Sequence, residues 1–234
     1  MNIVQLEPAY LLHSRPYRNT SLLADFFTLN YGRINGVIRG ARSKKNQTTV
    51  QVFAPLLISW SRRGNSDLVS IRAIEISDVN KRLTGRSLLY GFYINELLVR
   101  LLKTDDSYIE LYHRYKVLLQ YFSEKNTSEE NLRIFEKNLL SDLGYGLQLM
   151  HEAHSSKPVQ DDQWYDVILD QGPVLLATSQ AHVRHAFLGK SLLALHHHDF
   201  SCVETLKDAK RLMRKAFAEL LNHKPLKSRE LFYS

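Results

Sequence analysis

Hydrophobic and polar residues alternate through the first 80 positions, and the alternating runs are rich in β-branched and aromatic side chains. A period of two residues is typical of strands that bury one face. Turn-forming sequences such as Asn30-Tyr31-Gly32 and Arg63-Gly64-Asn65-Ser66 separate the runs and can supply the positive φ angles of tight hairpins. The pattern predicts five strands, at residues 9–13, 21–29, 33–39, 50–60 and 68–76.

Five short antiparallel strands expose unpaired edges unless the sheet closes on itself. A small barrel of the oligonucleotide/oligosaccharide-binding (OB) type is the commonest closure of this size, and an SH3-like barrel is the structural alternative. We therefore expect a five-stranded OB-type β-barrel over residues 1–80.

Beyond residue 80 the apolar positions recur with the period of 3.6 residues that marks amphipathic helices. They predict helices at residues 87–103, 105–122 and 128–143, and a last long helix that begins at residue 201. Two apolar runs on either side of Asp170-Gln171-Gly172-Pro173 predict a small hairpin. The expected fold class is α+β in four parts: a barrel domain at 1–80, a helical bundle at 81–148, a small hairpin-containing lobe at 149–180, and C-terminal helices packing on the bundle at 181–234.

The composition is ordinary for a globular protein, because 44% of the residues are hydrophobic and 24% are charged, which excludes a mostly disordered chain or a coiled-coil rod. The single cysteine, Cys202, excludes an intrachain disulfide and a cysteine-based metal cluster. The first ten residues carry no Lys or Arg, so we expect no secretory signal. The longest uncharged run, residues 46–61, is too short to span a bilayer. We expect a cytoplasmic protein with no membrane partner.

The charge is unevenly distributed. The chain has 31 Lys and Arg against 24 Asp and Glu, and residues 1–80 hold ten basic and five acidic side chains. Between Asp25 and Asp67 there is no acid, whereas the basic residues there are Arg33, Arg39, Arg42, Lys44, Lys45, Arg62 and Arg63. Such a surface can follow a phosphate backbone, although solvated surface charge is the alternative interpretation.

These positions define a candidate nucleic-acid surface. Strand alternation places Arg33 and Arg39 on one face, and the next ten residues continue it as a basic loop. Tyr17 lies between two arginines and is the best candidate for stacking on a base. The predicted contacts are Arg15, Tyr17, Arg18, Arg33, Arg39, Arg42, Lys44 and Lys45.

Two further basic surfaces lie on the predicted helices. Arg133 and Lys137 are four residues apart beside an apolar stripe, which suits an acidic peptide with an apolar end, although a plain amphipathic helix explains them equally well. On the last helix one side carries the basic residues Lys207, Arg211 and Arg214. That side is either a solvated helix face or a second contact for nucleic acid or an acidic peptide.

The sequence offers little for catalysis. Ten histidines include the pairs His151/His154 and His182/His185, but all-histidine structural zinc sites are rare and no carboxylate or thiolate joins them at motif spacing. There is no nucleophile elbow, phosphate-binding loop or paired-carboxylate motif. We predict no catalytic residues, no metal and no cofactor.

Several short segments, in order and at the expected spacing, resemble the RecO family of bacterial DNA repair proteins. These family segments are Tyr10-Leu11-Leu12-His13-Ser14-Arg15-Pro16-Tyr17, Thr20-Ser21-Leu22, Phe27-Thr28, Gly32-Arg33, Gly40-Ala41-Arg42-Ser43-Lys44, Pro55-Leu56-Leu57, Tyr93-Ile94-Asn95-Glu96-Leu97-Leu98, Leu143-Gly144-Tyr145-Gly146 and Lys224-Pro225-Leu226-Lys227-Ser228-Arg229-Glu230-Leu231. Any one segment is weak, but together they span essentially the whole chain.

The resemblance implies an OB domain, a helical bundle and a C-terminal lobe that in many members binds zinc through two Cys-x-x-Cys pairs. This sequence departs from the family there, because His151 and His154 stand where the first pair belongs and the second pair is absent. We therefore predict a degenerate zinc-finger-like lobe that is held together by packing.

The resemblance also implies a recombination mediator. Such a protein binds single- and double-stranded DNA, anneals complementary strands coated by single-stranded-DNA-binding protein, and works with RecR to load RecA. On this reading the acidic tail of the single-stranded-DNA-binding protein contacts Arg133 and Lys137, and the cytoplasmic protein joins the nucleoid during repair. Two other classes of function stay open: an OB-barrel RNA-binding module that acts in translation, and a metal-dependent nuclease.

Overall fold

The computed structural model describes residues 2–43, 46–47, 50–64, 66–78, 82–124, 128–177 and 185–232, with 46–47 described by their backbone alone. The chain forms two compact units: the barrel unit, Met1–Thr127 with Leu226–Ser234, and the C-terminal unit, Ser128–Pro225. In the described ranges no helix combines the length and the apolar character that crossing a membrane requires.

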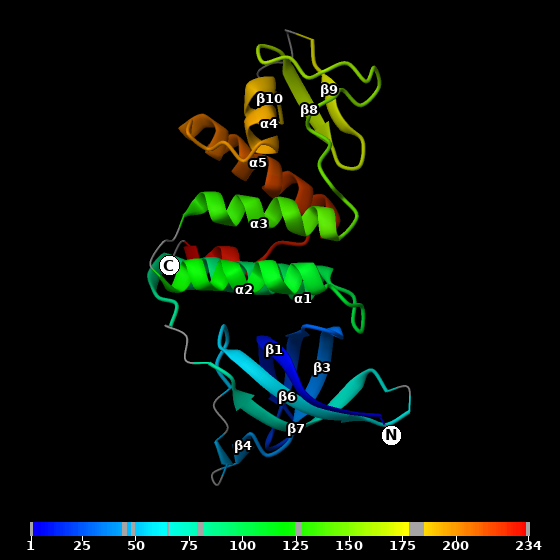
Figure 1. Cartoon of the computed structure of the whole chain (residues 1–234), viewed down its shortest axis with the longest axis vertical. Coiled ribbons are helices and arrows are strands. Elements are labelled where there is room, and N and C mark those ends of the chain that lie inside the picture. The colour runs from blue at the N-terminus through cyan, green and yellow to red at the C-terminus, as the bar shows by residue number, and fades with distance from the viewer. Residues whose placement is uncertain are drawn as a thin grey trace. The chain divides into compact units, whose positions relative to one another are not determined.

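Five strands of the barrel unit each pair with two neighbours, so that the sheet closes on itself (Figure 1). They are β1 (Asn2–Tyr17), β2 (Ser21–Thr28), β3 (Gly32–Ile38), β6 (Pro55–Arg62) and β7 (Leu68–Ile76). Their order is β1-β2-β3-β7-β6, and β6 returns to β1. Neighbouring strands are antiparallel, apart from β3 and β7, which run parallel over Asn35–Val37 and Leu68–Ser70. Between β3 and β6 the chain forms a small two-stranded sheet of β4 (Arg42–Ser43) and β5 (Asn46–Gln47).

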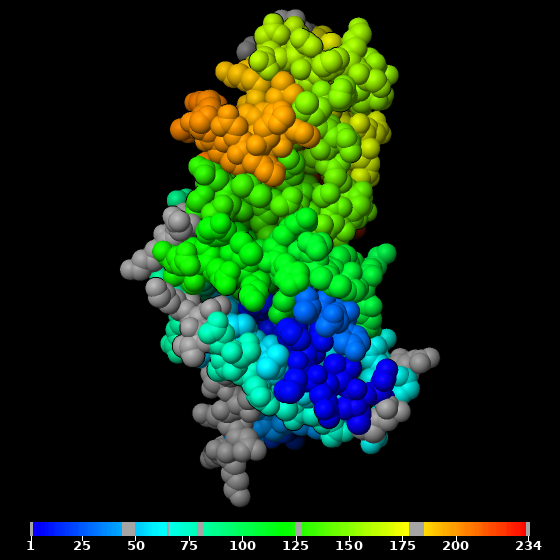
Figure 2. Space-filling view, in the orientation of Figure 1, coloured from blue at the N-terminus to red at the C-terminus, as the bar shows by residue number. Residues whose placement is uncertain are grey.

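The predicted α+β class with an N-terminal five-stranded sheet is confirmed. The first strand differs most from the prediction, because it runs from Asn2 to Tyr17 instead of covering residues 9–13. Glu7 and Pro8 interrupt the apolar alternation inside it, so the pattern predicts only its centre. The first half of β1 pairs with β6 and the second half with β2. The first half lies on the surface of the unit, where Ile3 is 58% exposed (Figure 2, dark blue).

Alternation along the strands decides which side chains fill the barrel. Along β3 the even-numbered residues are buried, whereas the odd-numbered ones between them are partly exposed. The inward side chains of all five strands and of the segment after β3 build one apolar core: Ala9, Leu11, Ala24, Phe26, Ile34, Ile38, Ala41, Leu56, Ile58, Trp60, Val69 and Ile71.

Helices α1 (Gly85–Leu101) and α2 (Ile109–Ser123) bury the outer side of β1. Tyr10 and Phe27 of the barrel meet Tyr112 and Tyr115 of α2, with ring centroids 5.2–6.0 Å apart. We call these four residues the aromatic cluster, and none of them is more than 5% exposed. Burial, with a smaller contribution from Asp78, raises the pKa of Tyr10 to about 12, so its hydroxyl stays neutral. These two helices are therefore part of the barrel unit.

A polar bridge crosses this apolar contact. The buried Asn95 of α1 donates its Nδ2–H to the Leu12 carbonyl of β1 over 2.8 Å and accepts a hydrogen bond from the Tyr115 hydroxyl over 2.6 Å. Buried polar groups are costly unless they are paired, so this amide allows only one position of α1 along β1.

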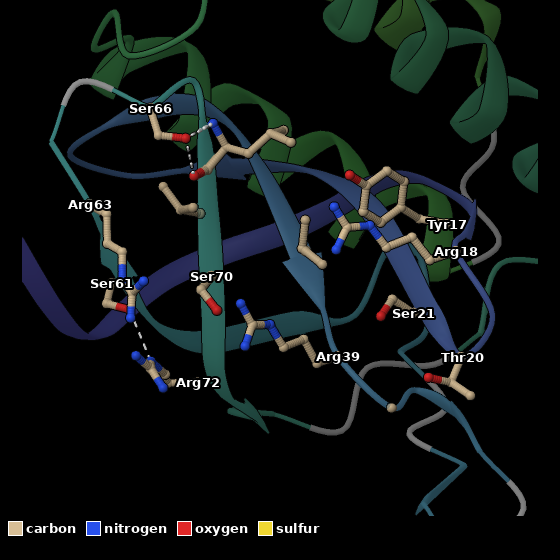
Figure 3. A pocket seen from close by; sticks show the side chains of 14 residues that line it. Tyr17, Arg18, Thr20, Ser21, Arg39, Ser61, Arg63, Ser66, Ser70 and Arg72 are labelled. Atoms are coloured by element: carbon tan, nitrogen blue, oxygen red, sulfur yellow. Dashed lines mark hydrogen bonds between the residues drawn. The ribbon is translucent and has the colours of Figure 1, made fainter.

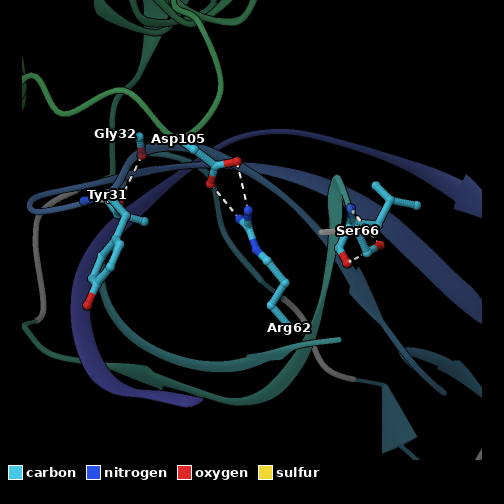
Figure 4. Close-up of polar contacts among 7 residues, drawn as sticks. Tyr31, Gly32, Arg62, Ser66 and Asp105 are labelled. Carbon is cyan, nitrogen blue, oxygen red and sulfur yellow. Dashed lines mark hydrogen bonds and ion pairs between the residues drawn. The ribbon is translucent and has the colours of Figure 1, made fainter. Parts of the chain in front are cut away.

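The loop between α1 and α2 completes the barrel beside the first part of β3, which β7 leaves unpaired. The backbone N–H of Asp105 in this loop donates to the Arg33 carbonyl over 3.0 Å. The Asp105 carboxylate accepts two hydrogen bonds from Arg62 at the end of β6, one of them over 2.9 Å (Figure 4). The loop thus ties β3 to β6 at one end of the barrel.

The loop between α1 and α2 approaches the β2–β3 turn so closely that the turn requires a glycine. Gly32 has a φ of +61°, and a Cβ on it would lie 1.7 Å from the Asp106 carbonyl oxygen. Only glycine satisfies both the left-handed backbone and the close contact.

The end of the chain returns to the barrel unit. The short 3-10 helix η2 (Lys227–Phe232) packs on α1. The Glu96 carboxylate of α1 accepts hydrogen bonds from the backbone N–H groups of Lys227 and Ser228, over 3.0 and 2.8 Å, and from the Ser228 hydroxyl over 2.7 Å. Arg100 lies 3.6 Å from the same carboxylate.

The C-terminal unit combines three helices with a small sheet. Its elements are α3 (Glu129–Asp142), β8 (Trp164–Ile168), β9 (Gly172–Leu175), β10 (Phe187–Leu188), α4 (Gly189–His196) and α5 (Val203–Leu220). The predicted hairpin is present as β8 and β9, and β10 pairs on the other side of β8. The helices predicted as one bundle thus fall into both units, since α1 and α2 belong to the first.

The sheet of the C-terminal unit has an apolar core of its own. Residues that are at most 5% exposed come from the strands, from the preceding loops and from α5: Leu149, Val159, Tyr165, Val167, Ala186, Phe187 and Met213. Apolar burial is the main stabilising contribution to a sheet of this kind. The lobe therefore buries apolar side chains of its sheet and of α5, and that packing alone holds it together stays a prediction.

We predict that Asn95→Leu lowers the free energy of unfolding by about 2–4 kcal/mol, because the buried Leu12 carbonyl and the buried Tyr115 hydroxyl each lose their hydrogen bond to the Asn95 amide. Urea unfolding followed by tryptophan fluorescence measures the change. Tyr115→Phe removes one of the two bonds and costs less, and the exposed Gln120→Ala serves as the neutral control. Equal midpoints for Asn95→Leu and the wild type would contradict the prediction.

We predict that Glu96 stabilises the return of the chain end in a pH-dependent way. Burial raises the pKa of this carboxyl, but the hydrogen bonds from Ser228 and Lys227 outweigh burial and lower it below 4.5. The stabilisation is therefore complete above the unfolded pKa and is lost as the pH falls through the lower folded value. At pH 7 Glu96→Gln costs roughly 1.5–3 kcal/mol.

The measurement is the difference in unfolding free energy between wild type and Glu96→Gln, which should shrink as the pH falls below the unfolded pKa and through the lower folded pKa of Glu96. The exposed Glu75→Gln, on β7, is the matched control. A difference that does not change with pH would show that the charge of Glu96 is not what holds η2.

Candidate nucleic-acid interface

A groove of about 690 Å³ opens on the barrel between the β1–β2 turn, the end of β3 and the β6–β7 hairpin. Four arginines line it, Arg18, Arg39, Arg63 and Arg72, and we call it the arginine groove. No acidic side chain is among the described residues that line it.

The strand pairing explains why the barrel opens here. β3 and β7 pair over only three residues each, so the chain leaves β7 as it continues from Ile38 to Gly40. The β1–β2 turn and the β6–β7 hairpin project on either side of this opening. The backbone N–H of Arg42 donates to the Thr20 carbonyl over 2.9 Å, which holds the segment after β3 against the β1–β2 turn.

The four arginines come from both walls. Figure 3 shows Arg18 and Arg39 on one side of the arginine groove and Arg63 and Arg72 on the other. All four side chains are exposed. Arg72 donates its Nε–H to the buried Ser61 hydroxyl over 2.9 Å, which fixes the guanidinium at the wall. Four positive charges at an opening without a lining acid make a site for a polyanion.

Several of the predicted DNA contacts meet at the arginine groove. Tyr17, Arg18 and Arg39 line it, and Arg42 is exposed beside it at the anchored segment. Arg15 is exposed on β1 two residues before Tyr17, and therefore on the same face of the strand. Lys44 and Lys45 lie outside the described residues.

Arg33 has a different environment from the one predicted for it. Its side chain is only 16% exposed and donates to the Asp25 carboxylate over 2.8 Å. Its Nε–H also donates to the Leu102 carbonyl over 3.0 Å. The alternation does place Arg33 on the outer face of β3, but Asp25 and the α1 end occupy its hydrogen-bonding groups, so it supports the fold.

The DNA contacts predicted from the sequence include neither Arg63 nor Arg72, although Arg63 lies in the stretch without acids between Asp25 and Asp67. The register of the β6–β7 hairpin pairs Ser61 with Ser70, which places Arg63 and Arg72 on opposite strands of one hairpin. Pairing the two predicted strands around the Gly64 turn is the signal that could have found Arg72.

Arg133 and Lys137 do not present free charge. Arg133, 5% exposed, lies 2.6 Å from the Glu136 carboxylate, which is fully buried. Lys137 donates to the carbonyls of Leu195 and His196 over 3.3 and 2.7 Å, at the end of α4. Burial lowers the pKa of Lys137. Lys137 thus joins α3 to α4, and Arg133 pairs with a buried carboxylate of its own helix, contacts that helix spacing alone cannot reveal.

The second predicted basic surface lies on α5. Lys207, Arg211 and Arg214 are exposed, opposite the buried residues of the helix. Arg211 is partly engaged, because it contacts Asp208 over 2.6 Å and covers the ring of Phe187 at 4.8 Å. Lys207 and Arg214 are the more accessible charges of this face.

The residues at the place of the family's zinc site do not fit that metal. His151 and His154 are exposed, and Cys202 lies at the exposed start of α5. Across the part of the chain that the structure describes, which leaves out His182, no three His, Cys, Asp or Glu side chains form a group that could hold a metal ion. Zinc binding in this lobe thus has no ligand set among these residues.

Comparison with known proteins gives a consistent picture. Residues 1–80 match the family described as Recombination protein O N terminal, and residues 82–230 match Recombination protein O C terminal. A DNA repair protein RecO from Coxiella burnetii (strain RSA 331 / Henzerling II) is 45% identical over 233 residues, which cover 98% of each chain. DNA repair protein RecO from Methylococcus capsulatus is 43% identical, covering 99% of this chain and 94% of the relative. The same-named protein of Proteus mirabilis is 41% identical, covering 96% and 90%.

We predict that Arg133→Ala destabilises the C-terminal unit by roughly 3–5 kcal/mol, because the fully buried Glu136 carboxylate loses its ion pair with Arg133. Arg214→Ala, at an exposed position on α5, should change stability by no more than about 0.5 kcal/mol. Urea unfolding of the two variants measures the contrast. If Arg133→Ala unfolds at the same urea concentration as the wild type, the ion pair is not structural, and Arg133 returns as a binding candidate.

Proposed function

Because the chain belongs to the RecO family of DNA repair proteins, we propose that it binds DNA in the arginine groove and acts in recombinational repair as a mediator that anneals complementary strands. One observation carries the proposal: four exposed arginines line one groove of the barrel, and none of its described lining residues is acidic. Phosphate groups are the ligands that such a groove would favour.

The topology supports an OB-type assignment. With β4 and β5 counted as an insertion, the strand order is first, second, third, fifth and fourth, and the third and fifth strands run parallel. OB barrels bind oligonucleotides at the second and third strands and at the loops that join strands one and two and strands four and five. Those two loops correspond to the β1–β2 turn and the β6–β7 hairpin, which border the arginine groove.

Annealing needs no bond chemistry, so the proposal does not require an enzyme. Two strands of like charge must approach, and cationic groups lower the electrostatic barrier between them. Since phosphates are common to single- and double-stranded DNA, the arginine groove would bind both. The family resemblance adds RecR and RecA as the partners of the loading step.

The acidic tail of single-stranded-DNA-binding protein is proposed to bind the exposed basic face of α5. Arg133 and Lys137 are engaged within the C-terminal unit, whereas Lys207 and Arg214 are accessible. Reversing Lys207 and Arg214 to Glu would test this contact without removing a buried partner.

We predict that replacing the four groove arginines with Ala weakens DNA binding at every sequence tested. It should also flatten the plot of log K against log salt by up to about 2.8 on single strands, at ~0.7 per lost phosphate contact. Fluorescence anisotropy over a salt series measures both effects. Lys116→Ala with Lys157→Ala removes exposed charge elsewhere and serves as the control. An unchanged salt slope in the fourfold variant would remove the arginine groove from the binding site.

The mediator role is tested by annealing of complementary strands that are precoated with the cognate single-stranded-DNA-binding protein. The wild type should accelerate annealing, and the fourfold variant should not. Tighter binding to RNA than to single-stranded DNA would favour the translation module instead. Metal-dependent cleavage of the labelled strands would favour a nuclease.

A further inference from the structure

We propose that the arginine groove holds a single strand by its phosphates and leaves its bases turned outward, free to pair. This inference rests on the proposed DNA-binding function and states which part of the strand the groove recognises. It differs from the usual OB arrangement, in which bases stack on aromatic side chains inside the groove.

The chemistry of the lining favours phosphates. Besides the four guanidinium groups it includes the hydroxyls of Thr20, Ser21 and Ser70, while those of Ser61 and Ser66 bond to Arg72 and to the Leu68 backbone. Guanidinium and hydroxyl groups donate hydrogen bonds, and phosphate oxygens accept them. Such contacts position a strand without reading its sequence.

The groove offers little surface on which a base could stack. Tyr17 is the one aromatic side chain among the described lining residues, and it is partly buried. The Arg18 guanidinium lies over its ring, 5.2 Å from the centroid. A stacked base would have to use the other ring face or displace Arg18. Base stacking therefore has at most one aromatic position here.

The other aromatic side chains of the barrel strands are not available to bases in this groove. Phe26, Phe27 and Trp60 are at most 3% exposed, since they fill the core or the contact with α2. Tyr31 is 44% exposed but packs edge-on against Trp60. Figure 4 shows Tyr31 near the Asp105–Arg62 pair, and it does not line the groove.

The phosphate donors are held in place before any ligand arrives. Arg72 is tied to Ser61, and Arg18 rests on Tyr17. The Ser66 hydroxyl donates to the Leu68 carbonyl over 3.0 Å and accepts from its N–H over 3.2 Å, which fixes the β6–β7 turn (Figure 3). Preorganised donors lose less conformational freedom on binding. A strand held in this way exposes its pairing edges to a second strand.

The experiment compares two fluorescent oligonucleotides of equal length, one of thymidine and one in which every base is replaced by an abasic tetrahydrofuran unit. Their phosphates are the same. We expect the full-length protein to bind them with dissociation constants within about threefold. If bases stacked in the groove, the abasic strand would lose roughly fivefold or more for each stacking contact, and the inference would fail.

Two variants sharpen the comparison. Arg39→Ala combined with Arg72→Ala should weaken binding of both strands by the same factor, because it removes phosphate contacts. Tyr17→Ala should affect both strands equally, whereas a stacking role would weaken the thymidine strand alone. Thymines of the bound strand should also react with permanganate as fast as those of the free strand, and protection of the thymines would contradict outward-facing bases.

The outcomes separate this inference from the proposed function. If the arginine variants leave binding of the thymidine strand unchanged, the groove is not the DNA site and the proposed function fails. If those variants weaken the thymidine strand but the wild type does not bind the abasic strand, the groove binds DNA and only the outward orientation of the bases is wrong.

Discussion

The barrel unit depends on one buried contact, the place where Asn95 of α1 bridges the Leu12 carbonyl and the Tyr115 hydroxyl inside the aromatic cluster. An unpaired carbonyl in such surroundings would cost roughly 1–3 kcal/mol, so α1 has one register on β1. That register places Glu96, the next residue, where it receives the N–H groups of η2. It also fixes where α1 ends and hence where the following loop meets the barrel.

The loop after α1 engages residues at the start of β3 and at the end of β6. Asp105 joins the Arg33 backbone to the Arg62 side chain, and Asp25 neutralises the Arg33 guanidinium. β3 continues past the three residues that pair with β7, and the arginine groove lies there. None of the described residues that line this groove is acidic. The acids of the barrel unit are thus placed so that some arginines build the fold while others remain available to a polyanion.

Much of the fold could be predicted from local pattern, because strand and helix periods are set by neighbouring residues. Four strands, the helices α1, α2, α3 and α5, and the hairpin of the C-terminal unit follow from that pattern, whereas α4 was not predicted. The candidate site was harder to predict, because whether an arginine is free to bind a ligand depends on its contacts with residues distant in sequence. Arg33 and Arg39 are equivalent in the alternation, yet only Arg33 meets Asp25 and the Leu102 carbonyl. Arg72 joins the groove only through hairpin register, and the burial of Arg133 follows from packing of α3 within its unit.

The family segments fall mainly on the scaffold, and the groove arginines lie between them. Glu96 and Ser228 belong to segments more than a hundred residues apart in sequence and meet in one hydrogen-bonded contact. Arg18, Arg39, Arg63 and Arg72 belong to none of these segments. A physical reason is available: the side chain at position 95 must donate to one buried carbonyl and accept from one buried hydroxyl at fixed positions, whereas a phosphate accepts a hydrogen bond from any guanidinium within reach. A groove that recognises charge rather than bases therefore needs a density of arginines, supported by a scaffold whose individual contacts allow few replacements.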